Sequence, residues 1–374
     1  MTSVTIVAND VGPNGGMERV LLELIKGLAA AGDRVTVIAR TCDLQGIDVA
    51  FHRVPGPRRP FVVAYPWFFI AAGMLVRRHR DGLVQATGAI VPNRVDIVSV
   101  HFCHRGFQSK GGGLRTSRGW PLFRLHARIA AAMSRIGESF CYRPSRVSTV
   151  VAVSRGVADE LRAYYPAIAD AVVVIPNGVD VDRFSPSADG RADTRSKLGL
   201  TNDALVALFV GGDWERKGLA VAIDALAESP QWILLIAGAG DQKHYVARAK
   251  RSGVADRTYF LGQVADTAPI FQAADLLVLP TAYEADPLVA IEAAAGGLAV
   301  LATPVNGIVD LIQDSVSGCF IERDAASISL HLQRLASDRQ ALARMGAEAR
   351  SAAAARSWRS VVELHRALYA TIRA

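Results

Sequence analysis

Short runs of consecutive apolar residues alternate along the chain with longer segments whose apolar residues recur every three or four positions. The runs at residues 3–10, 34–40, 81–88 and 95–101 are rich in Val and Ile and have the length of buried strands. Between the first two runs, the apolar positions predict an amphipathic helix over residues 17–31. Because parallel strands are buried on both faces and need helical crossovers, this alternation predicts an α/β fold.

The same alternation begins again in the second half of the chain, after a polar stretch at residues 187–203. The later strand-like runs span residues 204–212, 232–240, 257–264, 275–280 and 299–303. A chain of 374 residues is also long for one hydrophobic core. We therefore predict two Rossmann-like, doubly wound domains facing a cleft, over residues 1–175 and 176–356. Residues 357–374 have the pattern of a closing amphipathic helix, which we expect to pack back on the N-terminal domain.

Positive charge is concentrated in the first half of the chain. Residues 51–150 contain 16 Lys and Arg against three acidic residues, a balance of +13, whereas the whole chain carries +7. Next to an apolar, aromatic segment at residues 61–76, this charge favours an anionic membrane surface or a polyanionic substrate. Arginines scattered over a solvated surface explain it equally well. No zinc-finger, helix-turn-helix or RNA-platform pattern accompanies the charge, so nucleic acid is not expected as a partner.

The apolar segment at 61–76 falls short of the 18 residues of a membrane span and contains Pro66. Without a secretory pattern at the start, we expect a soluble, cytoplasmic chain, peripheral at most on the cytoplasmic face of the membrane. The four cysteines have no paired spacing, as expected of a reduced compartment. The sequence "HFCH" at 101–104 lacks a second ligand pair, so no metal site is predicted.

Ligands of doubly wound sheets bind beyond the carboxyl ends of the strands, which directs attention to the loops there. Gly15 and Gly16 lie between the first strand and the first helix, where a helix N-terminus favours an anion, although a plain tight turn explains them equally well. His101 directly follows an apolar run and would point into the cleft, placed to hydrogen-bond a sugar hydroxyl or a carbonyl. Lone histidines are more often structural.

A third loop, "FVGGDWERKGL" at residues 209–219, follows a strand and contains the glycine pair that includes Gly212. Arg216 and Lys217 at a helix start place two cations beside the helix dipole, an arrangement suited to a diphosphate. The loop lacks the Lys-Ser/Thr ending of a Walker motif. A basic surface turn is the simpler interpretation, but it leaves the glycines unexplained.

Two glutamates, Glu284 and Glu292, stand eight positions apart at the edge of an apolar helix. On one continuous helix they would lie about 80° apart in azimuth and about 12 Å apart along the axis. That is too far for the carboxyl pair of a glycosidase, about 5 to 9.5 Å apart. Asp286 as N-cap and Pro287 as the first helical residue would instead place Glu284 in the loop and Glu292 inside the helix.

The helix start predicted between the two glutamates leaves the N–H groups of Leu288 and Val289 without helical acceptors, so they could bind a phosphate. The carboxylates would then accept hydrogen bonds from hydroxyl groups on either side of it. A nucleotide sugar has this layout: sugar hydroxyls, a diphosphate and ribose hydroxyls.

Seven stretches taken together resemble one known family. They are "NGGMERVLLELIKGLAAAG", "VAVSRGVADEL", "VVVIPNGVDVDRF", "FVGGDWERKG", "FLGQV", "AADLLVLPTAYEADPLVAIEAAAGG" and "ATPVNGIVDLIQDSVSGCFIE". They are similar to the retaining glycosyltransferases of family 4, which have the GT-B fold, and the resemblance covers nearly the whole chain. It implies that the N-terminal domain contacts the acceptor and that the C-terminal domain binds the nucleotide sugar.

The resemblance also implies roles for individual residues. Glu284 would contact the transferred sugar and Glu292 the ribose, while Arg216 and Lys217 would hold the diphosphate. His101 would contact the sugar near its reacting carbon. Gly16 would lie beneath the donor or the acceptor. The loop at Gln263 and Val264 would contact the base.

This chain departs from the family pattern at a few positions. Gly212 stands where many members have an arginine, so the resemblance implies that Arg216 would supply that cation, as in members resembling lipopolysaccharide-core glucosyltransferases. Asp286 adds a carboxylate near the diphosphate, and Asp310 and Asn306 replace a usual glutamate and glycine. These changes concern the donor sugar more than the activity. Acceptor contacts would come from variable loops such as residues 104–120.

The resemblance and the residues that carry it thus imply transfer of a hexose-type sugar, with retention, from a UDP- or GDP-sugar to a glycan, lipid-linked or small-molecule acceptor. No metal or other cofactor is expected, because the two cations stabilise the leaving diphosphate. One alternative is a non-catalytic protein that binds sugar nucleotides. The other is a dinucleotide-dependent oxidoreductase, indicated by "GAG" at 238–240, although the third glycine of that fingerprint is missing.

Overall fold

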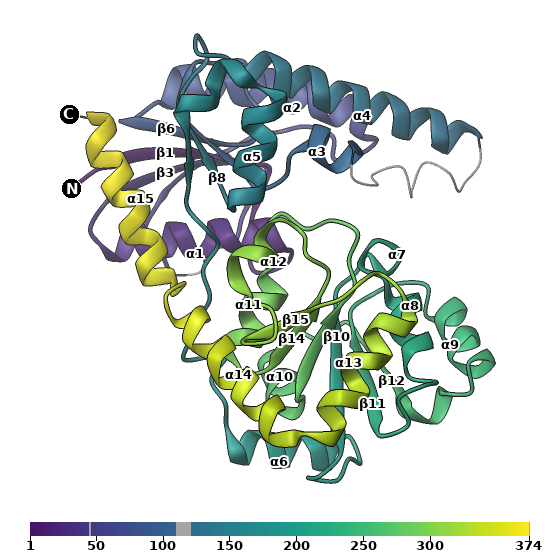
Figure 1. Cartoon of the computed structure of the whole chain (residues 1–374). Coiled ribbons are helices and arrows are strands. Elements are labelled where there is room, and N and C mark those ends of the chain that lie inside the picture. Colours follow the sequence, from purple (N-terminus) through teal and green to yellow (C-terminus); the bar gives the residue numbers. More distant parts are fainter. Residues whose placement is uncertain (45, 110–120, 374) are drawn as a thin grey trace. The chain divides into compact units, whose positions relative to one another are not determined.

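The computed structural model in Figure 1 describes residues 1–44, 46–109 and 121–373. The chain divides into two compact units. Unit 1 comprises Met1–Asn177 together with Trp358–Ala374, and unit 2 comprises Gly178–Ser357. Each unit contains a parallel sheet flanked by helices, which confirms the predicted α/β class with two Rossmann-like domains.

Unit 1 is built on a seven-stranded sheet in the order β5-β3-β1-β6-β7-β8-β9, parallel throughout. Its strands are β1 Ser3–Val7, β3 Arg34–Ala39, β5 Ala50–Arg53, β6 Leu83–Thr87, β7 Val95–Val100, β8 Val147–Ala152 and β9 Val172–Val174, and a small parallel pair joins β2 Asp10–Val11 to β4 Thr41–Cys42. The hydrophobic pattern missed β5 because this edge strand is mostly exposed and carries no apolar run.

Helices cover both faces of this sheet. They are α1 Gly16–Ala30, α2 Phe61–His79, α3 His104–Ser109, α4 Pro121–Cys141, α5 Arg155–Tyr164 and α15 Trp358–Arg373, with a 3-10 helix at Pro166–Ala171. The segment 104–120, predicted as a loop, begins with helix α3, and its remainder lies outside the described residues.

The last helix, α15, completes unit 1 beside α1. Gly27 of α1 packs against Val362 of α15. A Cβ added at Gly27 would lie 2.3 Å from a methyl carbon of Val362. Tyr369 donates its hydroxyl to Gln85 Oε1 at 2.6 Å, and Arg366 Nε donates to Asp33 Oδ2 at 2.8 Å. The C-terminal segment is therefore part of the core of unit 1, although unit 2 separates it in the sequence.

Unit 2 contains a six-stranded parallel sheet in the order β12-β11-β10-β13-β14-β15. Its strands are β10 Leu205–Val210, β11 Trp232–Ala237, β12 Thr258–Gly262, β13 Leu276–Leu279, β14 Ala299–Ala302 and β15 Gly318–Phe320. Its helices are α6 Ala188–Lys197, α7 Trp214–Lys217, α8 Leu219–Ala225, α9 Gln242–Arg251, α10 Ala268–Ala273, α11 Leu288–Ala295, α12 Asn306–Leu311, α13 Ala325–Ser337 and α14 Arg339–Ala354, with a 3-10 helix at Ala255–Arg257.

The polar stretch at 187–203 turned out to contain helix α6. Arg195 of this helix is fully buried, donates to the carbonyl of Ala273 at 2.9 Å and pairs with Asp275 at 3.0 Å. A helix held by an arginine in this way shows no apolar periodicity, so the sequence pattern gave no sign of it.

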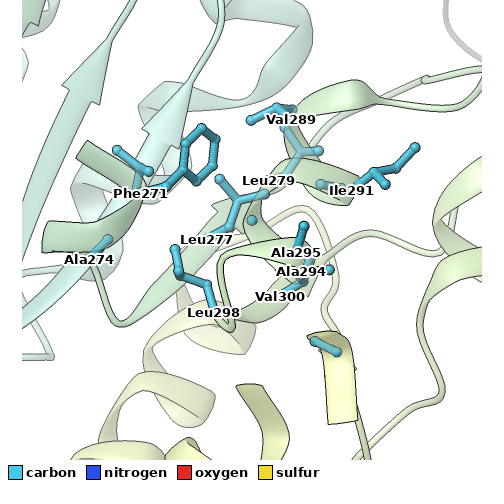
Figure 2. Close-up of a cluster of buried hydrophobic side chains, with 14 of the residues drawn as sticks. Phe271, Ala274, Leu277, Leu279, Val289, Ile291, Ala294, Ala295, Leu298 and Val300 are labelled. Atoms are coloured by element: carbon cyan, nitrogen blue, oxygen red, sulfur yellow. The ribbon is translucent and has the colours of Figure 1, made fainter. Parts of the chain in front are cut away.

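Helix α11 lies in the middle of the unit 2 core. Figure 2 draws one cluster of buried side chains that includes Val289 and Ile291 of this helix, Leu277 and Leu279 of β13, and Phe271. Burial of a leucine of this kind contributes about 1.5–3 kcal/mol. Because nearly every residue of α11 is buried, the start of this helix is held firmly against the sheet.

One described helix, α2, is long and apolar enough to cross a membrane by length and composition, and 33% of its apolar window is buried. Its outward positions are Val63, Trp67, Ile70 and Met74, spaced as on one helix face. Ile70 and Met74 are each 60% exposed. Helix α2 therefore presents an apolar face outside the core, which we call the outer face of α2.

Candidate active site

The predicted site residues of unit 2 centre on one carboxylate, Glu284. Arg216 Nη1 and Lys217 Nζ each donate to Glu284 Oε1 at 2.9 Å. The side chain of Glu284 is only 12% exposed. Burial by itself raises the pKa of Glu284, but Lys217 and Arg216 outweigh it and hold that pKa below its usual value. Glu284 thus forms one ion-pair cluster with two adjacent cations that lie 67 and 68 positions earlier in the sequence.

Glycines shape the loop that presents Arg216 and Lys217. An added Cβ on Gly211, at φ 149°, would lie 2.4 Å from the Lys217 side chain. Gly218 ends α7 at φ 80°, where an added Cβ would lie 2.2 Å from the carbonyl oxygen of Pro280. Trp214 anchors the turn by donating its indole N–H to the Gly211 carbonyl at 2.7 Å. The interpretation of this loop as a basic surface turn left its glycines unexplained. Gly211 and Gly218 let the backbone of the loop approach the Lys217 side chain and the Pro280 carbonyl closely.

The guanidinium of Arg216 is fixed on several sides. Its Nε donates to Asp213 Oδ2 at 3.3 Å, and its Nη1 donates to the Tyr283 carbonyl as well as to Glu284. The Ala282 N–H in turn donates to the Arg216 carbonyl at 2.9 Å. The loop after β13 and the loop after β10 are thereby joined through one residue.

The start of helix α11 differs from the prediction by one residue. The helix begins at Leu288 with Pro287 at the N-cap position, so Asp286 is not the cap. Arg356 Nη1 instead donates to Asp286 Oδ1 at 3.0 Å, and the Asp286 side chain is fully buried. The N–H groups of Leu288 and Val289 still open the helix, where intrahelical acceptors are missing.

The relation between the two glutamates is as predicted. Glu284 precedes α11 and Glu292 is its fifth residue, one turn inside the helix and buried. The two carboxylates therefore lie on either side of the helix start.

The remaining predicted positions of unit 2 lie in neighbouring loops after strands. Gly212 is exposed beside the Gly211 turn, and Gln263 is exposed directly after β12, whereas Val264 is partly buried against the core. In the "GAG" segment, an added Cβ on Gly238 would lie 2.1 Å from the Gly211 carbonyl oxygen. Gly238 allows the ends of two strands to pack closely. Its presence is therefore explained without a bound dinucleotide.

In unit 1, Gly15 and Gly16 form the start of α1. Gly15 is the N-cap at φ 99°, a conformation that other residues rarely adopt, and the carboxylate of Glu18 folds over it. An added Cβ on Gly16 would meet nothing within 4 Å. The loop before α1 thus requires a glycine at position 15 and is open at Gly16.

His101 lies directly after β7, as predicted. Burial lowers the pKa of His101 to about 4, and burial together with His101 lowers the pKa of His365 in α15 to about 3. Both imidazoles are therefore neutral near pH 7. A neutral imidazole both donates and accepts, so His101 is suited to a hydroxyl group rather than to a phosphate.

The sequence interpretation missed a pair between α3 and α4. His104 donates its backbone N–H to Glu138 Oε1 at 2.9 Å, and its ring Nδ1 lies 2.9 Å from the same oxygen. The second histidine of "HFCH" is the sequence signal for this pair, although the motif by itself indicates only a metal ligand. Among the described residues, no group of three or more His, Cys, Asp or Glu side chains is placed to hold a metal ion.

Comparison with known proteins identifies the family. The model "Glycosyltransferase Family 4" matches residues 14–183, and "Glycosyl transferases group 1" matches residues 190–352. A D-inositol 3-phosphate glycosyltransferase of Streptomyces scabiei is 30% identical over 383 residues, covering 93% of this chain and 84% of that protein. This chain is a family 4 glycosyltransferase. A protein of the same name from Xylanimonas cellulosilytica is also 30% identical, covering 93% of this glycosyltransferase and 89% of its own length.

Solved structures place this glycosyltransferase in the GT-B fold. WaaG, a glycosyltransferase involved in lipopolysaccharide biosynthesis, aligns with a TM-score of 0.82 at 21% identity, over 97% of this chain and 98% of that one. HepE of Anabaena, in complex with UDP-glucose, aligns with a TM-score of 0.78 at 19% identity, over 99% and 100% of the two chains. The family resemblance, the fold and the enzyme class predicted from the sequence are confirmed.

Proposed function

We propose that this glycosyltransferase moves a hexose-type sugar, with retention of configuration, from a UDP- or GDP-sugar to a glycan, lipid-linked or small-molecule acceptor. The observation that carries this proposal is the cluster in which Arg216 and Lys217 share one carboxylate oxygen of Glu284. Two cations held at the ends of parallel strands suit a diphosphate. The UDP-glucose complex of HepE supports a nucleotide sugar as donor, and the names of the inositol phosphate relatives support glycosyl transfer.

Departure of the nucleoside diphosphate is the step that needs the most stabilisation. Arg216 and Lys217 release Glu284 and bind the diphosphate instead. Together with the N–H groups of Leu288 and Val289, they neutralise the charge that develops on the leaving diphosphate. Glu284, relieved of its cations, accepts hydrogen bonds from the hydroxyls of the transferred sugar, and Glu292 accepts those of the ribose. Gln263 and Val264 contact the base. No metal or other cofactor takes part, because fixed cations do this work.

For the anomeric carbon we propose the front-face chemistry that the family resemblance implies. The bond from the anomeric carbon to the phosphate oxygen breaks, and the acceptor oxygen bonds to the same face of an oxocarbenium-like centre. The proton of the acceptor hydroxyl passes to the departing phosphate oxygen. For His101 we propose a hydrogen bond to the sugar near its reacting carbon, and for Gly15 and Gly16 a close approach of donor or acceptor to the open backbone.

The same enzyme is proposed to work in the cytoplasm, docked on the anionic cytoplasmic face of a membrane. The outer face of α2 supports this proposal, because its apolar side chains lie between two arginine pairs, Arg58 with Arg59 and Arg77 with Arg78. Apolar side chains between basic ones fit the boundary between acyl chains and anionic headgroups. A membrane-bound acceptor would then be within reach.

The donor proposal is tested by melting temperature against a panel of UDP- and GDP-sugars, with NAD as the competitor for the oxidoreductase alternative. A nucleotide sugar should raise the Tm of the wild type and fail to do so in Lys217→Ala. Lys243→Ala, which removes an exposed charge of α9 in the same unit, is the matched control and should keep the rise. Hydrolysis or transfer of the stabilising donor separates an enzyme from a protein that only binds. A response to NAD alone would overturn the proposal.

A further inference from the structure

A cavity of about 260 Å³ lies within unit 1, at the carboxyl ends of three adjacent strands. Asn9 follows β1, Thr87 ends β6 and His101 follows β7, and these strands are neighbours in the sheet. This edge is where ligands of doubly wound sheets bind. The cavity is near the lower limit of small-molecule pockets, about the size needed for one ring and its substituents.

The wall of this cavity is mainly aromatic and aliphatic. Phe61 and Tyr65 of α2 stack with their ring centroids 5.3 Å apart, and the Tyr65 hydroxyl donates to the Ala89 carbonyl at 2.6 Å. Phe102 and Tyr142 add two more rings. None of the described residues that line the cavity is a lysine or an arginine. A phosphate or carboxylate therefore finds no lysine or arginine among them.

The polar part of the wall is the pair formed by His104 and Glu138. Glu138 is 1% exposed, and its second oxygen accepts the Tyr165 hydroxyl at 2.7 Å. With its first oxygen facing the ring Nδ1 and the backbone N–H of His104, the carboxylate is satisfied from three sides. The carboxylate makes Nδ1 the nitrogen that donates to Glu138, so Nε2 is the ring nitrogen left to meet a ligand.

The ring of His104 also has room to meet a ligand. Its side chain is 40% exposed and lines the cavity beside His101. Within the described part of the chain, Nδ1 is the only ring nitrogen of His104 with a hydrogen-bond partner. A hydroxyl entering the cavity would thus find an oriented acceptor next to an apolar wall.

We propose that this cavity is the acceptor subsite and that it takes a neutral acceptor whose hydroxyl is borne on or beside an aromatic or aliphatic group. His104 positions the attacking hydroxyl by accepting its hydrogen bond, and the proton still leaves with the departing phosphate oxygen. The inference rests on the proposed transfer reaction and deepens it by naming the acceptor class. Glu138 acts through His104 and is a positioning residue.

An anionic acceptor is disfavoured by the same residues. A phosphate in this cavity would lie near a buried carboxylate and would lose its hydration without gaining a lysine or arginine from the described wall. The inositol phosphate named in several relatives is therefore not the acceptor expected for this chain.

The test compares three probes by calorimetric titration of the full chain in the presence of UDP. They are 4-nitrophenyl β-glucoside, methyl β-glucoside, which shares the sugar and lacks the ring, and D-inositol 3-phosphate. The aryl glucoside should bind at least tenfold more tightly than the methyl glucoside, and the inositol phosphate should not bind measurably. Equal binding of the two glucosides, binding of neither, or preference for the inositol phosphate would overturn the proposal.

Variants separate positioning from a purely structural role. His104→Gln should weaken binding of the aryl glucoside about three- to tenfold, the range of one hydrogen bond, while the Tm rise caused by the sugar-nucleotide donor is kept. Tyr165→Phe removes the other hydrogen bond to Glu138 and should lower Tm without changing aryl glucoside binding. If both variants lower Tm alike and neither changes binding, the pair is structural only. Loss of the donor response in the wild type would instead refute the proposed function itself.

Discussion

Lys217 Nζ and Arg216 Nη1 both lie 2.9 Å from the same oxygen of Glu284. A carboxylate that neutralises two cations keeps them oriented before any ligand arrives, and it lowers the cost of holding two positive charges together. The charge of an arriving diphosphate can then take the place of Glu284. Pre-organisation of this kind is the main source of electrostatic stabilisation in enzymes, so Lys217 is the most direct point at which to test the site.

Lys217→Met should lower kcat for sugar transfer by about 10²–10³-fold, because it removes one cation from the leaving diphosphate and nearly preserves the shape of the side chain. Steady-state kinetics with a saturating donor measures this effect. The exposed-site variant Lys243→Met controls for the loss of one charge in unit 2 and should retain its kcat. A variant at position 217 with unchanged kcat would show that the cluster is structural.

Gly218→Ala should destabilise the chain and disturb the site together. At φ 80° the new side chain is strained, and its Cβ would lie 2.2 Å from the Pro280 carbonyl oxygen, so the turn behind Lys217 must shift. Gly253→Ala is the matched control, because Gly253 has φ 69° and nothing within 4 Å of an added Cβ. The control should lose only the stability that it costs an alanine to adopt a positive φ, about 1 kcal/mol.

The comparison of the two glycine variants is made by chemical unfolding and by the donor-induced rise in Tm. We expect a clearly larger loss of stability for Gly218→Ala, together with a weakened donor response. Equal losses in the two variants would mean that the Pro280 contact relaxes without cost.

Stability should fall as the pH is lowered, in a range set by the buried His365 and the partly buried His101. The pKa of His365 is lowered to about 3 and that of His101 to about 4, against about 6.5 in an unfolded chain. Above pH 6.5 both states are neutral and nothing depends on pH. At a pH between the unfolded and folded pKa values, only the unfolded chain binds the proton. The free energy of unfolding therefore decreases as the pH is lowered, by up to about 1.4 kcal/mol per pH unit for each histidine.

His365→Phe should flatten this dependence, because a ring without a titratable nitrogen removes one of the two contributions. The temperature of unfolding, followed from pH 7.5 to 5, should fall less steeply in this variant than in the wild type. The exchange His244→Phe, at an exposed position of α9, should leave the slope as it is. Identical slopes in wild type and His365→Phe would contradict the assignment of neutral, buried imidazoles.

The sequence predicted the fold class because strands buried on both faces appear as continuous apolar runs, as in Val95–Val100 and Leu205–Val210. It also predicted that Glu284 precedes a helix containing Glu292. The errors came from long-range partners. Asp286 has the chemistry of an N-cap, but Arg356, seventy positions away, takes its carboxylate.

Two further features depend on partners distant in the sequence. Glu138 is an isolated acid in a basic segment, and nothing local indicates that it pairs with His104 thirty-four residues earlier. Helix α6 is polar along its length because its packing depends on Arg195 and Asp275 rather than on an apolar stripe. Local pattern reveals elements that bury apolar surface, whereas elements held by polar pairs become visible only when both partners are placed.

Binding to lipid vesicles should depend on the outer face of α2. The double variant Ile70→Glu with Met74→Glu places two negative charges on this face, where both side chains are 60% exposed and folding does not require them to be apolar. The wild type should sediment with vesicles that contain anionic lipid and much less with neutral vesicles, whereas the variant should remain in the supernatant. Leu330→Glu, at a position of α13 that is 66% exposed, controls for added charge elsewhere and should bind as the wild type does. Equal partition of the wild type onto both kinds of vesicle, or binding by the double variant, would rule out this face as an anionic membrane contact, and the arginines beside α2 would then be explained by solvation alone.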